Sequence, residues 1–216
     1  MQVATRGVRP GAARAGFTLL ELLAVIVILG ILMIFLVPLL GKSEDVARMQ
    51  TTRAYLSTLG SAISEFENEK GDFTSSSWKD EWGTPPTTTN IGAAALVIAL
   101  FGSKWRTSIS EDRLINTDND ESKKALAGFP KPALFEIKDE WDNPIAYSHR
   151  RDYDHPQTYL LKDPKTGEAR ESVFKARQNP QTGQYWNPKG FQLVSAGPDG
   201  EFGTEDDIPN WKEQKD

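Results

Sequence analysis

The chain has 216 residues, with 25 Lys and Arg against 30 Asp and Glu, and a formal net charge of −5 at pH 7. No basic face is apparent, which argues against nucleic acid as the main partner. There is no cysteine, so no disulfide can stabilise the fold. Stability must therefore come from a hydrophobic core, with a bound metal as a further source.

The N-terminus combines a basic leader with a long apolar run. The leader carries no acidic residue and three basic ones: Arg6, Arg9 and Arg14. Residues 22–40 carry no charge, and a segment of ~20 apolar residues crosses a hydrocarbon core of ~30 Å. The positive-inside rule keeps such a leader cytoplasmic and exports the chain beyond the apolar run. Because an ordinary secretory signal has a shorter apolar region, we predict a transmembrane helix over 17–40 and an exported head over 41–216.

Glu21 stands near the start of this apolar helix. A carboxylate inside a membrane helix is rare and usually has a partner or a task. One interpretation places Glu21 at the interface, where its side chain reaches water close to Arg14.

The stretch that carries these features reads Arg14-Ala-Gly-Phe-Thr-Leu-Leu-Glu21. It resembles the class III signal of type IV pilins and type II secretion pseudopilins. In that family a prepilin peptidase cuts after the glycine and methylates the new N-terminus. The resemblance implies a leader over 1–16, cleavage between Gly16 and Phe17, and methylation of Phe17. An uncleaved signal anchor holding a soluble domain is the alternative.

The same resemblance gives Glu21 a second interpretation, since it matches a glutamate of the family. In a staggered filament the Glu21 carboxylate of one subunit would neutralise the Phe17 amine of its neighbour. Two opposite charges attract strongly in a low dielectric. This pair would set the axial register of the filament.

Apolar residues continue at helical spacing after the membrane run. They are Val46, Met49, Leu56, Leu59, Ile63 and Phe66. This amphipathic pattern predicts one helix from Phe17 to about Lys70, ended at Gly71. Its first half lies in the membrane or the filament core, and its second half supports the head.

The middle of the chain reads as a variable loop region over 71–135. Residues 71–90 are rich in Ser, Thr, Pro and Gly, and 92–101 form a short apolar helix that cannot span a bilayer. Residues 102–131 are polar and are expected to be a surface excursion. The acidic cluster at 118–121 lacks glycines, and we expect it to be a solvated loop.

Short β-rich runs occur from Trp141 onward. The runs are 145–147, 158–162, 169–177 and 191–195. Turn sequences between them predict an antiparallel β-meander. The segment DEWDNPIAY resembles the stretch that opens the sheet of the major secretion pseudopilin, with Asp142 in place of its glycine. We therefore expect an α+β, pilin-like fold, in which the long N-terminal helix packs on a sheet and a C-terminal loop within 141–211.

That C-terminal loop concentrates carboxylates among glycines between Ser195 and Ile208. Its acidic residues are Asp199, Glu201, Glu205, Asp206 and Asp207. Carboxylates this dense repel one another unless they are solvated or bridged by a cation. A compact set of oxygen ligands suits Ca²⁺, and the lack of thiols and nearby histidines disfavours zinc. The spacing is not that of an EF-hand, and a solvated acidic loop is the alternative.

The loop also resembles the calcium loop of the major type II pseudopilin, Ser-x-Gly-x-Asp-Gly and then Asp-Ile-x-Asn-Trp. The resemblance implies Ca²⁺ as the cofactor. It implies these ligands: side-chain oxygens of Asp199, Asp206 and Asp207, and backbone carbonyls of Ala196 and Glu201. Glu205 could replace one member of the aspartate pair.

Nothing in the sequence indicates catalysis. There is no P-loop, G-x-S-x-G or HExxH motif. His149 and His155 flank a predicted loop at 150–154, and nothing in the pattern fixes their geometry. We predict that the chain is not an enzyme and has no catalytic residue.

The resemblances together imply a structural subunit of the periplasmic pseudopilus of a type II secretion system, which supports export of folded proteins. They imply a single-pass inner-membrane precursor and a helical homo-oligomer. The implied partners are the prepilin peptidase, the inner-membrane assembly platform, minor pseudopilins, and membrane lipid before assembly. The class III signal alone would equally suit a type IV pilus or competence pilin. The calcium loop, and the lack of the disulfide typical of many type IV pilins, favour the secretion system.

Overall fold

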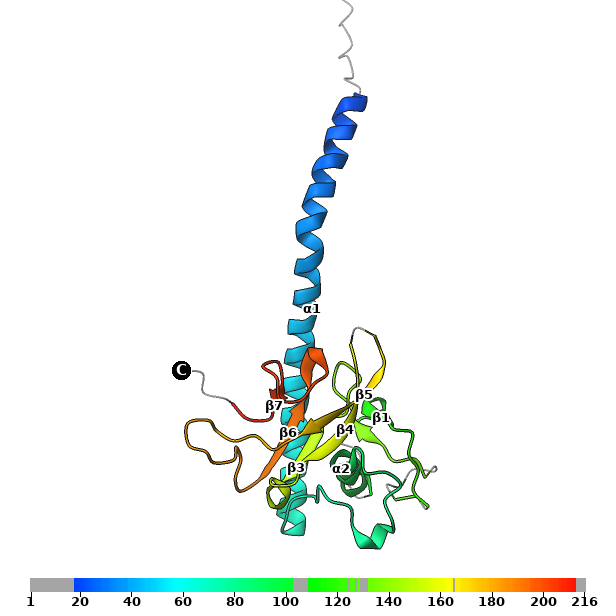
Figure 1. Ribbon diagram of the computed structural model, residues 1–216, viewed down its shortest axis with the longest axis vertical. Coiled ribbons are helices and arrows are strands. Elements are labelled where there is room, and N and C mark those ends of the chain that lie inside the picture. Colours follow the sequence, from blue (N-terminus) through cyan, green and yellow to red (C-terminus); the bar gives the residue numbers. More distant parts are fainter. Residues whose placement is uncertain are drawn as a thin grey trace, which may run out of the picture. The chain divides into compact units, whose positions relative to one another are not determined.

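The computed structural model describes residues 18–102, 109–123, 125, 126, 128, 132–164 and 166–212, with the backbone alone for 35–43. The chain divides into two compact units, one ending at Glu44 and the other beginning at Asp45. A long helix comes first, and antiparallel strands come after a second, shorter helix (Figure 1). The predicted α+β class, with its pilin-like order of elements, is confirmed.

The long helix α1 runs from Leu19 to Lys70. It ends where the sequence predicts, because Gly71 adopts φ +82° and its N–H donates to the Glu67 carbonyl at 2.7 Å. A glycine in this left-handed conformation is a common helix terminator. The predicted start at Phe17 lies outside the described residues.

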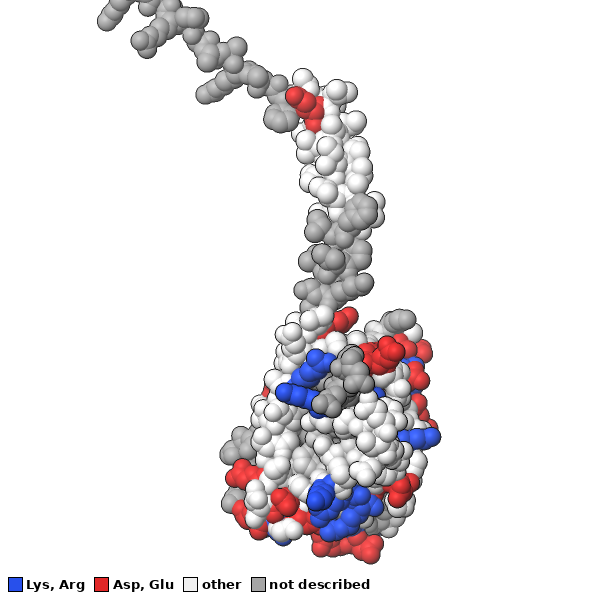
Figure 2. All heavy atoms as spheres, turned by 90° about the vertical axis from the view of Figure 1, so that its left-hand side faces the viewer, with Lys and Arg blue, Asp and Glu red and all other residues white. Residues whose placement is uncertain are grey.

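The first part of α1 exposes its apolar side chains. Between residues 19 and 34 the large apolar side chains are 46–84% exposed. In Figure 2 this stretch is white apart from acidic atoms near its described end. As far as the residues are described, no helix is long and apolar enough to cross a membrane. The predicted span over 17–40 extends beyond them, since Phe17 and the side chains of 35–40 are not described.

The strands form one small sheet and two separate pairs. The sheet has the order β3-β6-β7 and is antiparallel; it consists of β3 (Ala146–His149), β6 (Phe191–Ser195) and β7 (Ile208–Pro209). The antiparallel pairs are β1 (Leu114–Ile115) with β2 (Glu136–Ile137), and β4 (Gln157–Lys162) with β5 (Ala169–Phe174). The predicted continuous β-meander is therefore wrong, because β3 pairs with β6, and β4 and β5 pair apart from them. The four predicted strands correspond to β3, β4, β5 and β6, with β5 shorter than expected. β1, β2 and β7 were not predicted.

Both faces of the β3–β6 pair are covered, and every residue of these two strands is buried. On one face, Tyr147 and Leu193 pack with Leu56 of α1 and with helix α2 (Ile91–Phe101). On the other face, Ala146 and Val194 pack with a second apolar cluster that contains Tyr159, Leu161 and Phe174 of the β4–β5 pair. Strands covered on both faces are continuously buried and do not alternate. Figure 1 shows α1 and α2 beside this sheet.

The expected surface excursion at 102–131 is wrong for its described part. Ile109 is 3% exposed and belongs to the main core cluster. Strand β1 pairs with β2, and Glu121 bridges to Ala133. The apolar side chains of Ile109 and Leu114 draw the segment onto the head, because leaving them in water would forgo the free energy of burying them.

Asp139 anchors the turn that opens the sheet. Its Oδ1 accepts the N–H groups of Trp141 and Asn143 at 2.9 and 3.0 Å, and its Oδ2 accepts the hydroxyl of Ser195 at 2.6 Å. Burial raises the pKa of the Asp139 carboxyl to about 6. The side chain therefore ties the turn at 139–144 to the end of β6, just before the acidic loop.

Asp142, which stands where the resemblance led us to expect a glycine, adopts φ +58°. Its carboxylate pairs with Lys138 Nζ at 2.6 Å. A left-handed conformation is strained for side chains other than glycine, least so for Asp and Asn. The backbone conformation at this position therefore favours glycine and tolerates aspartate.

We expect Asp142→Gly to change the free energy of unfolding by less than about 0.5 kcal/mol, because relief of the positive φ offsets the exposed ion pair. Asp142→Ile should lose about 1–2 kcal/mol, since a β-branched side chain fits this conformation poorly. Denaturant unfolding of the two variants checks this. Equal losses of unfolding free energy in both variants would show that the ion pair with Lys138, and not the backbone conformation, determines the stability contribution of Asp142.

Candidate functional site

The described N-terminus of α1 is closed by a reciprocal pair of side chains. Thr18 precedes the helix, and Glu21 Oε2 accepts both its N–H and its hydroxyl at 2.8 Å. The Glu21 N–H donates back to Thr18 Oγ1 at 3.3 Å. This is a capping box, which satisfies N–H groups that a helix start leaves free. Glu21 thus has a local partner, whereas Arg14, Gly16 and Phe17 lie outside the described residues.

The predicted calcium loop closes on itself through its own carboxylates. Asp199 Oδ1 accepts the Glu201 N–H at 2.8 Å, and Asp206 Oδ2 accepts the Asp199 N–H at 3.1 Å. Gly197 has φ +65°, and a Cβ there would lie 2.3 Å from the Asp206 carbonyl oxygen. Only glycine fits this close approach. The tight crossing brings Asp206 back onto the residues that begin the loop.

Asp207 is the buried member of the loop, at 7% exposure. Its Oδ2 accepts the Gly203 N–H at 2.8 Å and lies 3.7 Å from Arg177, while its Oδ1 is buried without a hydrogen-bond partner. Burial raises the pKa of Asp207 to about 7. An orphaned carboxylate oxygen in this position fits a cation ligand, because burying it unpaired is costly.

The other predicted ligands differ in exposure, and Asp207 is not among the residues that line the pocket beside them. The side chains of Glu201 and Glu205 are exposed, and Ala196 is fully buried. Burial, with a contribution from the Asp206 charge, raises the pKa of Asp199. Arg170 donates to the carbonyls of Asp199 and Gly200 at 3.0 and 3.1 Å. A pocket of about 400 Å³ lies here, lined by Asp199, Glu201 and Asp206 together with Arg170.

A different acidic cluster forms the tightest group. Asp118, Asp120 and Glu136 each offer a carboxylate oxygen, and these atoms lie within 4.8 Å of one another. Across the described ranges no other three His, Cys, Asp or Glu residues meet this closely. The aspartates of the C-terminal loop do not meet this closely either. The chemistry of three convergent carboxylates suits a hard metal cation.

This cluster corrects the expectation of a solvated loop at 118–121. Asp120 is 7% exposed and Glu136 is fully buried. Burial and the Asp118 charge raise the pKa of Asp120 to about 7, and the same two causes raise that of Glu136 well above its usual range. Sequence reasoning missed Glu136, which is distant along the chain. The signal was a single carboxylate inside the apolar run 133–137.

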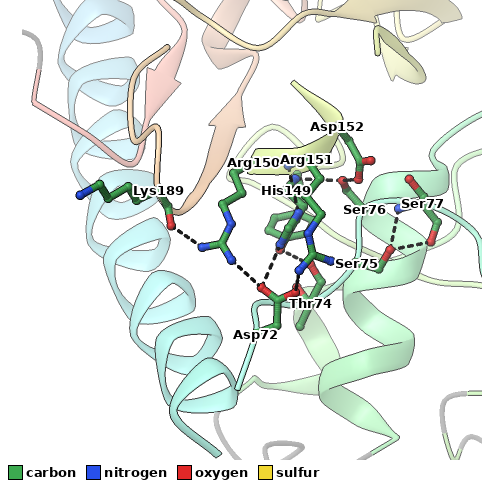
Figure 3. Close-up of polar contacts among 11 residues, drawn as sticks. Asp72, Thr74, Ser75, Ser76, Ser77, His149, Arg150, Arg151, Asp152 and Lys189 are labelled. Atoms are coloured by element: carbon green, nitrogen blue, oxygen red, sulfur yellow. Dashed lines mark hydrogen bonds and ion pairs between the residues drawn. The ribbon is translucent and has the colours of Figure 1, made fainter. Parts of the chain in front are cut away.

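His149 belongs to a structural clamp (Figure 3). It is 3% exposed, its Nδ1 accepts the Arg151 N–H at 3.1 Å, and its Nε2 lies 3.4 Å from Asp72 Oδ1. Arg150 and Arg151 also pair with Asp72, Arg150 at 3.0 Å. Burial lowers the pKa of His149. The clamp ties the segment after α1 to the end of β3, whereas His155 is exposed.

Two comparisons with known proteins bear on the family that this chain resembles. Residues 11–37 match the model of the prokaryotic N-terminal methylation motif. The chain is also 28% identical over 196 residues to the type II secretion system core protein G of Escherichia coli (strain K12), which covers 91% of this chain and 90% of the relative. The resemblance to the type II secretion pseudopilins is confirmed.

The two matches differ in how much of the chain they cover. The motif spans the region of Gly16, Phe17 and Glu21, whereas the similarity to core protein G extends over nearly the whole chain. No solved structure matches the chain.

Proposed function

We propose that this pseudopilin is the structural subunit of the periplasmic pseudopilus of a type II protein secretion system and supports export of folded proteins. The observation that carries the proposal is the methylation motif at 11–37 on a chain similar to core protein G over nine-tenths of its length. A motif alone would suit any type IV filament. The full-length similarity favours the secretion system over a type IV pilus, a competence pilin or a signal-anchored periplasmic domain.

The precursor is anchored in the inner membrane by residues 17–40, with its head in the periplasm. Prepilin peptidase removes residues 1–16 and methylates Phe17, after which subunits join a helical homo-oligomer on the assembly platform with minor pseudopilins. The exposed apolar side chains between 19 and 34 support this step. They need lipid before assembly and neighbouring helices after it, because such surface is costly in water.

The C-terminal loop holds Ca²⁺ in this proposal. Asp199, Asp206 and Asp207 supply side-chain oxygens, Ala196 and Glu201 supply carbonyls, and Glu205 is the substitute for one aspartate. The buried orphan oxygen of Asp207 supports this assignment. The ion would supply positive charge where Asp199 and Asp206 meet, and so hold the loop against β6.

Processing gives the direct test of the proposal. Mass spectrometry of the assembled protein should find a methylated Phe17 as the first residue. Gly16→Val should leave the full-length precursor in the membrane, because a branched side chain replaces the small residue at the cut. Assembled wild-type filaments that retain residues 1–16 would contradict the proposal.

A secretion assay separates the remaining alternatives. Deleting the gene should stop export of the system's folded substrates, and the wild-type gene should restore it. Unchanged export together with loss of surface pili or of DNA uptake would instead assign the chain to a pilus or competence system.

A further inference from the structure

Three carboxylates of this head lie together without enough hydrogen-bond donors. Asp118 and Asp120 come from the turn after β1, and Glu136 lies in β2 opposite Ile115. One oxygen from each lies within 4.8 Å of the others. None of the three forms an ion pair with a Lys, Arg or His in the described part of the chain.

The turn that holds the two aspartates is rigidly built. The Asp120 N–H donates to Asn116 Oδ1 at 3.2 Å, and the Asp120 carbonyl accepts from Asn116 Nδ2 at 2.9 Å and from the Leu134 N–H at 3.2 Å. Asn119, between the aspartates, has φ +55°. The backbone of the turn thus holds the two aspartates next to β2, and they are not part of a freely solvated loop.

Few donors reach the six carboxylate oxygens. The Thr117 N–H donates to Glu136 Oε2 at 3.2 Å, and the Asn90 side chain also hydrogen-bonds Glu136. The Thr87 hydroxyl lies 3.1 Å from Asp118 Oδ2, 3.4 Å from Asp120 Oδ2 and 3.2 Å from the Thr89 carbonyl. A hydroxyl has one proton, so it serves only one of these acceptors at a time.

Each carboxylate therefore keeps an orphan oxygen. Asp118 Oδ1, Asp120 Oδ1 and Glu136 Oε1 are buried without a hydrogen-bond partner, and the Glu136 side chain is fully buried. A buried unpaired carboxylate is expensive, and three that face one another also repel. A cation, or protons shared among the three, would remove that penalty.

We infer that Asp118, Asp120 and Glu136 form a second Ca²⁺ site in this head, apart from the C-terminal loop. Hard oxygen ligands select Ca²⁺ or Mg²⁺ over softer metals. Ca²⁺ suits the site better because it accepts irregular geometry and bidentate carboxylates, whereas Mg²⁺ demands a tight octahedron. The Thr87 hydroxyl oxygen is placed to join the three residues.

The site would connect three segments of the head. Thr87 precedes α2, Asp118 and Asp120 come after β1, and Glu136 lies within β2. The Asn90 side chain strengthens the same junction, since its Nδ2 donates to Thr117 Oγ1 at 2.8 Å and its Oδ1 accepts the Leu160 N–H at 2.9 Å. A bound ion would thereby fasten the segment after α2 to the rest of the head.

Equilibrium dialysis of the full chain in detergent, stripped by chelator and loaded with radioactive Ca²⁺, tests the inference. Glu136→Gln should bind one Ca²⁺ per chain fewer than wild type, because the amide keeps the shape and loses the charge. Glu121→Gln is the matched control: this acid is exposed in the same segment and should bind as wild type does. A folded Glu136→Gln that keeps every Ca²⁺ would overturn the site.

Asp207→Ala separates this site from the C-terminal loop. Glu136→Gln should remove one Ca²⁺ both in the wild-type background and in the Asp207→Ala background. If Asp207→Ala changes nothing while Glu136→Gln still removes one ion, the loop proposal fails and this one stands. Loss of all binding in Asp207→Ala alone would overturn this one.

Melting curves distinguish a bound ion from a merely structural cluster. With chelator present, Glu136→Gln should melt at or above the wild-type temperature, since one of three repelling charges is gone. Adding Ca²⁺ should raise the melting temperature of Glu136→Gln by less than it raises that of the wild type. If Glu136→Gln fails to fold, Asp118→Asn, the more exposed member, must lose the one Ca²⁺ instead. Displacement of that Ca²⁺ by equimolar Mg²⁺ would overturn the choice of ion.

Discussion

Glu21→Ala should be inserted and cleaved as the wild type is, yet should form no stable filaments. Insertion depends on the apolar run and cleavage on the leader, and both are intact. Assembly depends, in our proposal, on the pairing of the Glu21 carboxylate with the Phe17 amine of a neighbouring subunit. In the low dielectric of packed helices the unpaired amine would be costly. Filaments recovered by shearing or cross-linking, counted against processed subunit, measure the effect.

The capping box makes a sharper comparison possible. Glu21 also accepts the Thr18 N–H and hydroxyl, so the alanine removes a helix cap together with a charge. Glu21→Gln keeps an oxygen for the cap and loses only the charge, and it should fail as Glu21→Ala does. Thr18→Ala loses hydroxyl bonds worth about 1 kcal/mol but keeps the charge, and it should still assemble. Filaments from Glu21→Gln would assign the defect to the cap and remove the charge pair.

The C-terminal loop gives the second large effect. If Ca²⁺ binds only the folded chain, it stabilises the head by about 2.7 kcal/mol at a hundredfold excess over Kd and about 4.1 kcal/mol at a thousandfold excess. The full chain in detergent should therefore melt higher with Ca²⁺ than with chelator. Ca²⁺ binding at the loop should contribute a share of this rise in melting temperature. Asp199→Ala and Asp207→Ala should each remove most of that share.

The control for the loop is a variant of the exposed Glu205, which would be a ligand only if it replaced one member of the aspartate pair. Glu205→Ala should keep the Ca²⁺-dependent gain if Asp206 and Asp207 are the ligands. In cells, Asp199→Ala and Asp207→Ala should lower subunit level and secretion together, because an unstable head is degraded. A melting temperature that does not respond to millimolar Ca²⁺ in the wild type would mean that the loop is a solvated turn.

Local patterns were enough to predict much of this fold. The end of α1 at Lys70 is explained by Gly71, because a glycine in the left-handed conformation commonly terminates a helix. The strands β3, β4 and β6 are explained by β-rich runs between turn residues. The resemblance at residues 14–21 identified the pseudopilin relationship, because a leader, a cut and an apolar helix are consecutive along the chain and need no tertiary contact.

The sequence by itself therefore determined the order of elements, the acidic loop and the relationship to pseudopilins, since all of these depend on neighbours in the chain. Only the tertiary structure decided which carboxylates share a buried space. Asp118 and Asp120 read as a solvated loop until the pairing of β1 with β2 places Glu136 beside them. The physical reason is that the electrostatic environment of a carboxylate depends on burial and on groups within a few ångströms, and folding draws these from distant parts of the sequence.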